Sequence, residues 1–519
     1  MTNTLPTLKQ AAVLAAVWGG LLLLSPVHGL AQEQSPTFRP ITLLECIQTA
    51  LLKNHALQIQ RLNPAIARNT LRGSYGYYDP WFTADVRRES LSDSGGFDPA
   101  DFSKDAVYRA DSTTARLALT GVLPTGARYT LGGDYANSYG TRNFMDFDSY
   151  NLNADLTLQQ PLLKNFWIDQ GRMTIQINKH NLKITELGVR YLANDVINQV
   201  QLAYYELLYA REYLGIQQGL VAMRHRLLAG VNRQIEVGML TPPDAQLAQS
   251  QLAVAQAECV SASNLVVLAE NALKTILGEA HDQAPARRLL PQEQLITVPE
   301  AFDLHESWTR ALRLRADLAQ LRLDLKKAEV DLKYRHNQLF PSLDLVAGYG
   351  RRGASTVQTW PGYPAAASAS EAFSQIGRGD NPSIRVGVIF SLPLGRTMER
   401  GSYQASKHLK MQAALLVKQK EQVVMQEVSD ALHTAQADWD RLQVMREAVK
   451  SAENALAAEE RRLAGGKSTL FVVLQLQRDL ATVQTTEARA RANYNQAVSR
   501  WRWAEGSLLE SHRIALDLR

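Results

Sequence analysis

Apolar residues recur at every seventh position along much of this chain. The longest series comprises Ala193, Val200, Leu207, Leu214, Val221, Leu228 and Ile235, and the same spacing resumes with Leu252, Cys259, Val266 and Leu273. A heptad repeat kept over this length is typical of helices that pack as in a coiled coil. The pattern predicts a helical hairpin from about Gly171 to Gly278, broken once at 237–244. At 1.5 Å per residue, its first arm would reach about 100 Å.

The C-terminal half contains a second hairpin of the same kind. Its heptad positions are Val428, Ala435, Leu442, Val449, Leu456 and Leu463. This series breaks at 464–469, and a return arm continues to about Gly506. Heptads alone are also typical of a rigid helical rod with no further function. The segments between the hairpins must therefore decide whether the helices form only such a rod or part of a larger fold.

Those segments alternate between apolar and polar residues, which predicts strands at 82–90, 150–160, 343–350 and 384–392. The alternation is strictest where Tyr150, Leu152, Ala154, Leu156 and Leu158 are separated by polar residues. Ten residues with this pattern match a tilted membrane strand with one face toward lipid and the other toward water. An edge strand of a soluble sheet has the same local pattern. The long helices and an N-terminal export signal favour the membrane interpretation.

Three stretches beside these strands carry weaker signals. Residues 90–111 are rich in Asp, Ser and Gly and are predicted to form a solvated loop. Residues 115–135 turn at Leu123-Pro-Thr-Gly126 and predict an extra β-hairpin. Whether this hairpin extends or caps a barrel wall stays open. Residues 351–382, rich in Gly, Ala and Ser, are predicted to form an exposed loop.

The two halves are related by an internal duplication. A shift of 261 residues superimposes Leu43 on Leu304, Glu45 on Glu306, Ala50 on Ala311, Leu57 on Leu318, Arg61 on Arg322 and Pro80 on Pro341. We therefore predict two structural repeats, 32–278 and 301–510, with a linker at 279–300 and a tail at 511–519. Each repeat would contain a helix, a strand, a long loop, a strand and a long helical hairpin. The first helix is predicted to start after Thr42, which with Glu45 forms a capping box, and to end near Tyr78 before Pro80.

The N-terminus indicates export. Lys9 precedes an apolar run at 11–24, and Gly29-Leu-Ala31 provides the small residues of a cleavage site, so 1–31 is predicted to be a signal peptide. Cys46 and Cys259 could pair in an oxidising compartment, but two cysteines are no disulfide framework for 519 residues, and free thiols are favoured. The formal charge of +5 is mild and interspersed, which does not indicate nucleic-acid binding.

No motif in the sequence indicates catalysis or the binding of a nucleotide or a metal ion. Gly465-Gly-Lys-Ser468 resembles the end of a phosphate-binding loop, but Arg461 stands where the first glycine is required and a helix precedes it. The ten histidines show no metal-site spacing. We therefore predict no enzymatic activity, no cofactor and no metal site. On the polar faces of the strands, Asp85, Arg87, Asp155 and Arg385 are predicted to face a barrel lumen, where they would either select solutes or hydrate a wide pore.

The order of these elements, repeated twice, together with the turn Val237-Gly-Met-Leu-Thr-Pro-Pro-Asp244, resembles the TolC-like outer-membrane efflux family over nearly all of the mature chain. The resemblance implies a mainly α fold with membrane β: three copies form one duct, each adding four transmembrane strands to a shared barrel and long helices to a periplasmic tunnel. This is physically reasonable, because four strands cannot close on themselves and open sheet edges are not tolerated in lipid.

The resemblance also implies that the hairpin turns are periplasmic tips that contact an adaptor protein. The residues concerned are Gly238, Thr241, Asp244, Gly466, Lys467 and Ser468. Asp244 matches an acidic position of the family, whereas Val472 and Gln475 stand where some members carry acidic gate residues, which counts against an acidic ring here. The expected function is a passive exit duct for a tripartite efflux pump or type I secretion system, with an inner-membrane transporter as a further partner. The alternative is an envelope-spanning structural or adhesive coiled coil without a pore.

Overall fold

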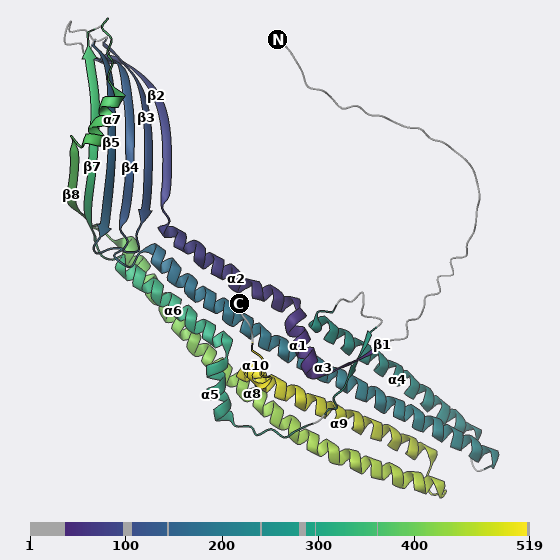
Figure 1. Ribbon diagram of the computed structural model, residues 1–519. Helices are drawn as coiled ribbons and strands as arrows, with labels where there is room; N and C mark the ends of the chain where they lie inside the picture. Colours follow the sequence, from purple (N-terminus) through teal and green to yellow (C-terminus); the bar gives the residue numbers. More distant parts are fainter. Residues whose placement is uncertain are drawn as a thin grey trace, which may run out of the picture.

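A computed structural model describes residues 37–96, 106–142, 145–238, 241–279, 287–295, 297–360 and 362–515. These residues form an elongated molecule with a β-sheet at one end and long helices that extend from it to two paired tips at the other (Figure 1). The predicted signal peptide, 1–31, lies outside the described residues. The predicted combination of long helical hairpins and a β-sheet is confirmed.

The long helices lie side by side in a single layer that is four helices wide. Next to the sheet, the neighbours in order are α2 (His55–Tyr75), α3 (Gln170–Glu236), α6 (Ala316–Asn337) and α8 (Thr397–Ala464). Farther from the sheet, α4 (Pro242–Leu277) and α9 (Leu470–Glu505) replace α2 and α6, so that the order becomes α4, α3, α9 and α8. The heptad residues Ala193, Val200 and Leu207 are fully buried between these helices. The layer therefore has two lateral edges, one formed by α2 and α4 and the other by α8.

Each repeat begins with two helices, not with the single helix predicted from the sequence. The first pair is α1 (Leu43–Lys53) and α2, which separate at Asn54, and the second is α5 (Leu304–Leu314) and α6, which separate at Arg315. Asn54 has an extended backbone, and its side-chain oxygen accepts a hydrogen bond of 3.1 Å from the Leu57 amide, so it caps the second helix. The two breaks lie 261 residues apart, as the duplication requires. A short 3₁₀ helix, η1 (Gly76–Tyr78), follows α2.

The segment predicted as a linker contains a strand. β6 (Arg287–Pro291) pairs in parallel with β1 (Thr37–Ile41) across the helical layer. Leu289 of β6 and Ile41 of β1 are buried with Tyr204 of α3 in the largest apolar core, and the Tyr204 hydroxyl donates to the Ile41 carbonyl at 3.3 Å. A last helix, α10 (Leu508–Ser511), adds Leu508 and Leu509 to this core. Both cysteines are free, as the sequence favoured.

Within the described residues, the sheet has six antiparallel strands where the sequence predicted four. Their order is β2 (Trp81–Gly96), β3 (Ala106–Val122), β4 (Arg128–Arg142), β5 (Met145–Pro161), β7 (Ser342–Thr359) and β8 (Pro382–Ser391). The hairpin at 115–135 thus extends the sheet, and the loop predicted at 90–111 is largely strand. The sequence signal fades there because Ser and Asp occupy both faces of the strands, while backbone pairing continues without an apolar face.

The loop predicted at 351–382 is also ordered in part. β7 continues to Thr359, and α7 (Ala369–Arg378) packs on the same face of the sheet as Leu152, whose side chain is buried beneath it. A Cβ on Gly353 would lie 1.9 Å from the Ala372 carbonyl oxygen, so only glycine permits this approach.

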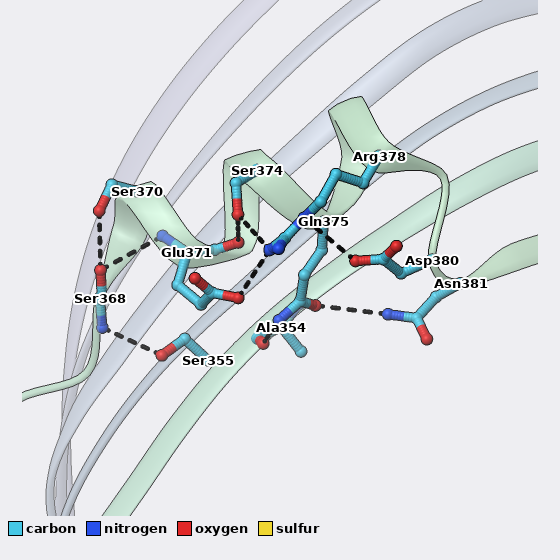
Figure 2. A network of polar contacts seen from close by, with 10 residues as sticks. All are labelled: Ala354, Ser355, Ser368, Ser370, Glu371, Ser374, Gln375, Arg378, Asp380 and Asn381. Carbon is cyan, nitrogen blue, oxygen red and sulfur yellow. Dashed lines mark hydrogen bonds and ion pairs between the residues drawn. The ribbon is translucent and has the colours of Figure 1, made fainter.

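Helix α7 also covers the edge of β7 that continues past the shorter β8 (Figure 2). The Gln375 side chain accepts a hydrogen bond from the Ala354 amide at 3.0 Å and donates one to the Ala354 carbonyl at 3.0 Å. Ion pairs of Arg378 with Glu371 and Asp380 hold the helix end. The amide of Gln375 therefore satisfies both backbone groups that a neighbouring strand would otherwise satisfy.

Candidate functional site

The sheet has one apolar face and one polar face. The apolar face carries a row of residues that are direct neighbours across all six strands: Phe82, Leu119, Leu131, Leu156, Tyr349 and Ile384. Phe82 and Ile384, at the two ends of this row, are 68% and 76% exposed. A contiguous apolar surface of this extent on a sheet calls for lipid or another protein surface.

The polar face carries all four residues that were predicted to line a lumen. Asp85 lies opposite Arg116 of β3, Asp155 lies opposite Gly350, and Arg385 lies opposite Gly348. The alternation of side chains along each strand places Arg87 on this face as well. Asp155 and Arg385 line one shallow depression of the polar face together with Arg352. Positive and negative side chains are mixed on this face, so neither sign of charge dominates it.

The first helical tip is built by a capping box. Gly238 has a φ of 78° and ends α3, and Thr241 starts α4. The Asp244 carboxylate accepts hydrogen bonds from the Thr241 amide at 3.0 Å and from its hydroxyl at 2.7 Å. These hydrogen bonds, the one from the hydroxyl foremost, lower the pKa of Asp244, so the carboxylate is charged at neutral pH. Asp244 therefore has a local structural role that the sequence comparison with the family did not suggest.

The second tip reverses the chain with two glycines. Gly466 has a φ of 68°, and the Lys467 amide donates to the Arg462 carbonyl at 2.8 Å, which closes the end of α8. The Ser468 hydroxyl donates to Glu459, and Lys467 is exposed. The structure thus places Gly238, Thr241, Gly466 and Lys467 on the surface of the tips, with Asp244 and Ser468 partly covered.

The two tips are joined by a small apolar cluster that sequence reasoning missed. Leu470 and Leu474 of α9 are buried against Val231 of α3 and Ala248 of α4. Beside the cluster, the Arg224 guanidinium, 3% exposed, donates to the Leu474 carbonyl at 3.1 Å. Burial lowers the pKa of Arg224, and the neighbouring Arg478 adds to this.

The spacing of Leu470, Val473 and Leu474 was a visible signal for a buried face. What it could not show is that the partner surface belongs to the other repeat. One acidic side chain lies close to Gln475, one of the two positions at which this chain was noted to lack the acidic gate residues of some family members: Asp479 accepts a hydrogen bond of 3.0 Å from Gln475.

The segments of this chain that match a known family correspond to the same two repeats. A sequence model of the family described as "Outer membrane efflux protein" matches residues 111–279 and 308–506, which is most of the chain. The chain belongs to the outer membrane efflux protein family. The predicted family, the outer-membrane location and the role in efflux are thereby confirmed.

Individual relatives support this assignment. Outer membrane protein TolC of Escherichia coli K12 is 24% identical over 388 residues, covering 75% of this chain and 76% of TolC. The fold resembles that of the outer membrane protein VceC from Vibrio cholerae, at 17% identity and a TM-score of 0.62, over 89% of this chain and 96% of that one. It also resembles the MtrE outer membrane channel of Neisseria gonorrhoeae, at 15% identity and a TM-score of 0.61, over 89% and 88%.

Proposed function

We propose that three copies of this efflux protein form one passive duct, which receives its cargo from an inner-membrane transporter through a periplasmic adaptor. The observation that carries the proposal is the two-faced sheet. Among the described strands, β2 and β8 each have a neighbour on one side only. An unpaired edge in lipid leaves backbone N–H and C=O groups without partners, at several kcal/mol each. Pairing the β2 edge of one copy with the β8 edge of the next satisfies both edges and encloses the polar face.

The helical layer supports the same arrangement, because its lateral edges carry exposed apolar side chains. On one edge these are Ile59, Leu62 and Ile66 of α2 with Val254, Val260 and Leu268 of α4, and on the other Leu409, Leu415 and Val444 of α8. Among the described helices, α4 is long and apolar enough to cross a membrane by length and composition. Its place in a hairpin with α3 at the layer edge favours contact with another copy instead. Three layers joined at these edges form a helical tunnel that continues the barrel.

The tips are the proposed contact with the adaptor. Their proposed contact residues are Gly238, Thr241, Asp244, Gly466, Lys467 and Ser468. The tips stand at the end of the molecule farthest from the sheet (Figure 1). The duct itself performs no chemistry in this proposal: the transporter supplies the energy, and the adaptor opens the tips. A coiled coil without a pore would not need a sheet with one lipid-compatible face and one hydrated face.

Crosslinking between copies tests the closed wall. Val86 of β2 and Val386 of β8 are on the apolar face and highly exposed. In a background with Cys46→Ala and Cys259→Ala, the pair Val86→Cys and Val386→Cys should give covalent trimers with a short bismaleimide. Val86→Cys with Arg385→Cys is the matched control, since Arg385 lies on the opposite face, and it should stay monomeric on denaturing gels. Equal crosslinking in both variants would contradict the proposed edge pairing.

Conductance and tip labelling test the duct. Purified trimers in planar bilayers should form water-filled channels, and a folded trimer that never conducts would overturn the proposal. A photoreactive crosslinker attached at Thr241→Cys or Ser468→Cys should capture an adaptor in cells. The same crosslinker at the sheet position Val86→Cys should not.

A further inference from the structure

We infer that the assembled barrel has eighteen strands and that the β3–β4 hairpin widens its pore. The inference rests on the proposed trimer and extends it. It starts from a difference between the two repeats: β2 and β7 begin 261 residues apart, at Trp81 and Ser342, whereas α4 and α9 begin 228 apart, at Pro242 and Leu470. The first repeat is therefore 33 residues longer. The excess corresponds to β3 and β4, since β7 and β8 of the second repeat pair directly.

The hairpin matches its neighbours on the apolar face. Leu119 of β3 lies beside Phe82 of β2, and Leu131 of β4 lies beside Leu156 of β5. A register slip of one residue would turn all of these side chains to the other face. The row of apolar residues at the level of Leu156 therefore runs from β2 through the hairpin to β5, as a lipid-facing wall requires and a cap over the pore does not. Helix α7 covers the same face farther along the strands, at Leu152.

The polar face is matched in the same way. Arg116 of β3 lies between Asp85 of β2 and Asp134 of β4 in the ladder. The Asn153 side chain of β5 then donates to Asp134 at 2.8 Å. Opposite charges on directly opposed residues stabilise strand pairing, so Arg116 of β3 has an acidic neighbour on both sides, and Asp134 of β4 has Arg116 on one side and the Asn153 amide on the other. A hairpin that only covered the mouth would have no need of this complementarity.

The turn of the hairpin is anchored at the junction with the helices. The Trp167 amide donates to the Thr125 carbonyl at 3.4 Å, and the Arg172 side chain donates to the Pro124 carbonyl at 2.6 Å. Gly126 has a φ of 88°, and a Cβ there would lie 2.5 Å from the Asn165 carbonyl oxygen. The hairpin is thus attached along both strands and at its base.

The width of the sheet relative to the helical layer also favours six wall strands per copy. Six strands about 4.8 Å apart and tilted by about 40° span roughly 38 Å of wall, and four strands would span roughly 25 Å. Four helices packed 8–10 Å apart span roughly 32–40 Å. Six strands therefore cover the layer of α2, α3, α6 and α8 beneath them, while four would be narrower. Closed over three copies, the barrel has a diameter of about 36 Å between backbones, compared with about 24 Å for twelve strands.

Electron cryomicroscopy of the wild-type trimer in a lipid nanodisc tests the inference directly. The cross-section should show eighteen strands, with β3 and β4 in the wall. Twelve strands with the hairpin outside the wall would overturn it, whatever the behaviour of any variant. The proposed trimer is tested separately, by the crosslink between Val86→Cys and Val386→Cys. A crosslinked trimer with twelve strands would refute the widened barrel alone.

A second experiment measures the pore. Thr157→Cys places a thiol on the polar face of β5, in the cysteine-free background, where maleimide-polyethylene glycols of increasing size can reach it through the barrel mouth. The full chain should react with larger polymers than a variant that lacks 106–142, in which β2 joins β5 directly. Thr241→Cys at the exposed tip is the control and should react equally in both backgrounds. Equal size limits at Thr157→Cys, in variants that both crosslink as trimers, would show that the hairpin does not widen the pore.

Discussion

The small apolar cluster that joins the two helical tips allows a quantitative test of how the tips are held together. Leu474 is 5% exposed and packs in the cluster that connects α9 to α3 and α4. Leu→Ala at buried sites destabilises by about 2–5 kcal/mol, and the small size of this cluster points to the lower end. A loss of about 2 kcal/mol changes an equilibrium roughly 30-fold. If the cluster holds the tips together, Leu474→Ala should shift the equilibrium between joined and separated tips by about this factor toward separation.

Single-channel recording in planar bilayers measures this effect. Leu474→Ala should raise the open probability while the trimer stays intact by light scattering. Val237→Ala is the matched control, because it also shortens an apolar side chain at a tip but Val237 is 71% exposed. An intact Leu474→Ala trimer with wild-type gating, or a Val237→Ala trimer that opens equally, would refute the role assigned to the cluster.

Three further predictions concern the capping box, one ion pair and the covered strand edge. Thr241→Ala should destabilise the start of α4 by about 1 kcal/mol, seen as faster amide exchange in its first turn, whereas Thr241→Ser should retain the protection. Asp317 is half-buried, and this partial burial opposes ionisation, but hydrogen bonds from Arg315 and Lys420 outweigh it and lower the pKa of Asp317 from 3.8 to about 2. Its stabilisation of about 2 kcal/mol is therefore complete above about pH 4 and lost as the pH falls toward 2. Asp317→Asn should lower the unfolding midpoint at pH 7 and remove that part of the acid dependence; an unchanged pH profile would contradict the assignment. Gln375→Leu should expose the Ala354 amide to exchange, while Gln375→Glu, which can still accept from that amide, should expose it less; equal exchange in both would argue against the edge cap.

The two breaks between the paired helices show where sequence reasoning stopped. Nothing local predicts a break at Arg315, because arginine is a good helix former. In the folded chain the Arg315 guanidinium is buried, lies 2.6 Å from Asp317 and also pairs with Glu427 of α8, more than a hundred residues away. A buried charge needs such partners, and Glu427 comes within reach of Arg315 only once α6 and α8 have packed together.

By itself, the sequence determined the long hairpins, the duplication and the two-faced strands. Heptad spacing, capping residues and apolar–polar alternation act within a few turns or residues, so they can be read along the chain. Only the tertiary structure decided how many strands share the sheet, where α7 lies and how the tips are joined. Each of these depends on partners distant in the chain, as where Leu474 meets Val231 or Gln375 covers Ala354. Backbone pairing outside the apolar band is indifferent to side-chain pattern, which is why β2 and β3 continue through a stretch that reads as a loop.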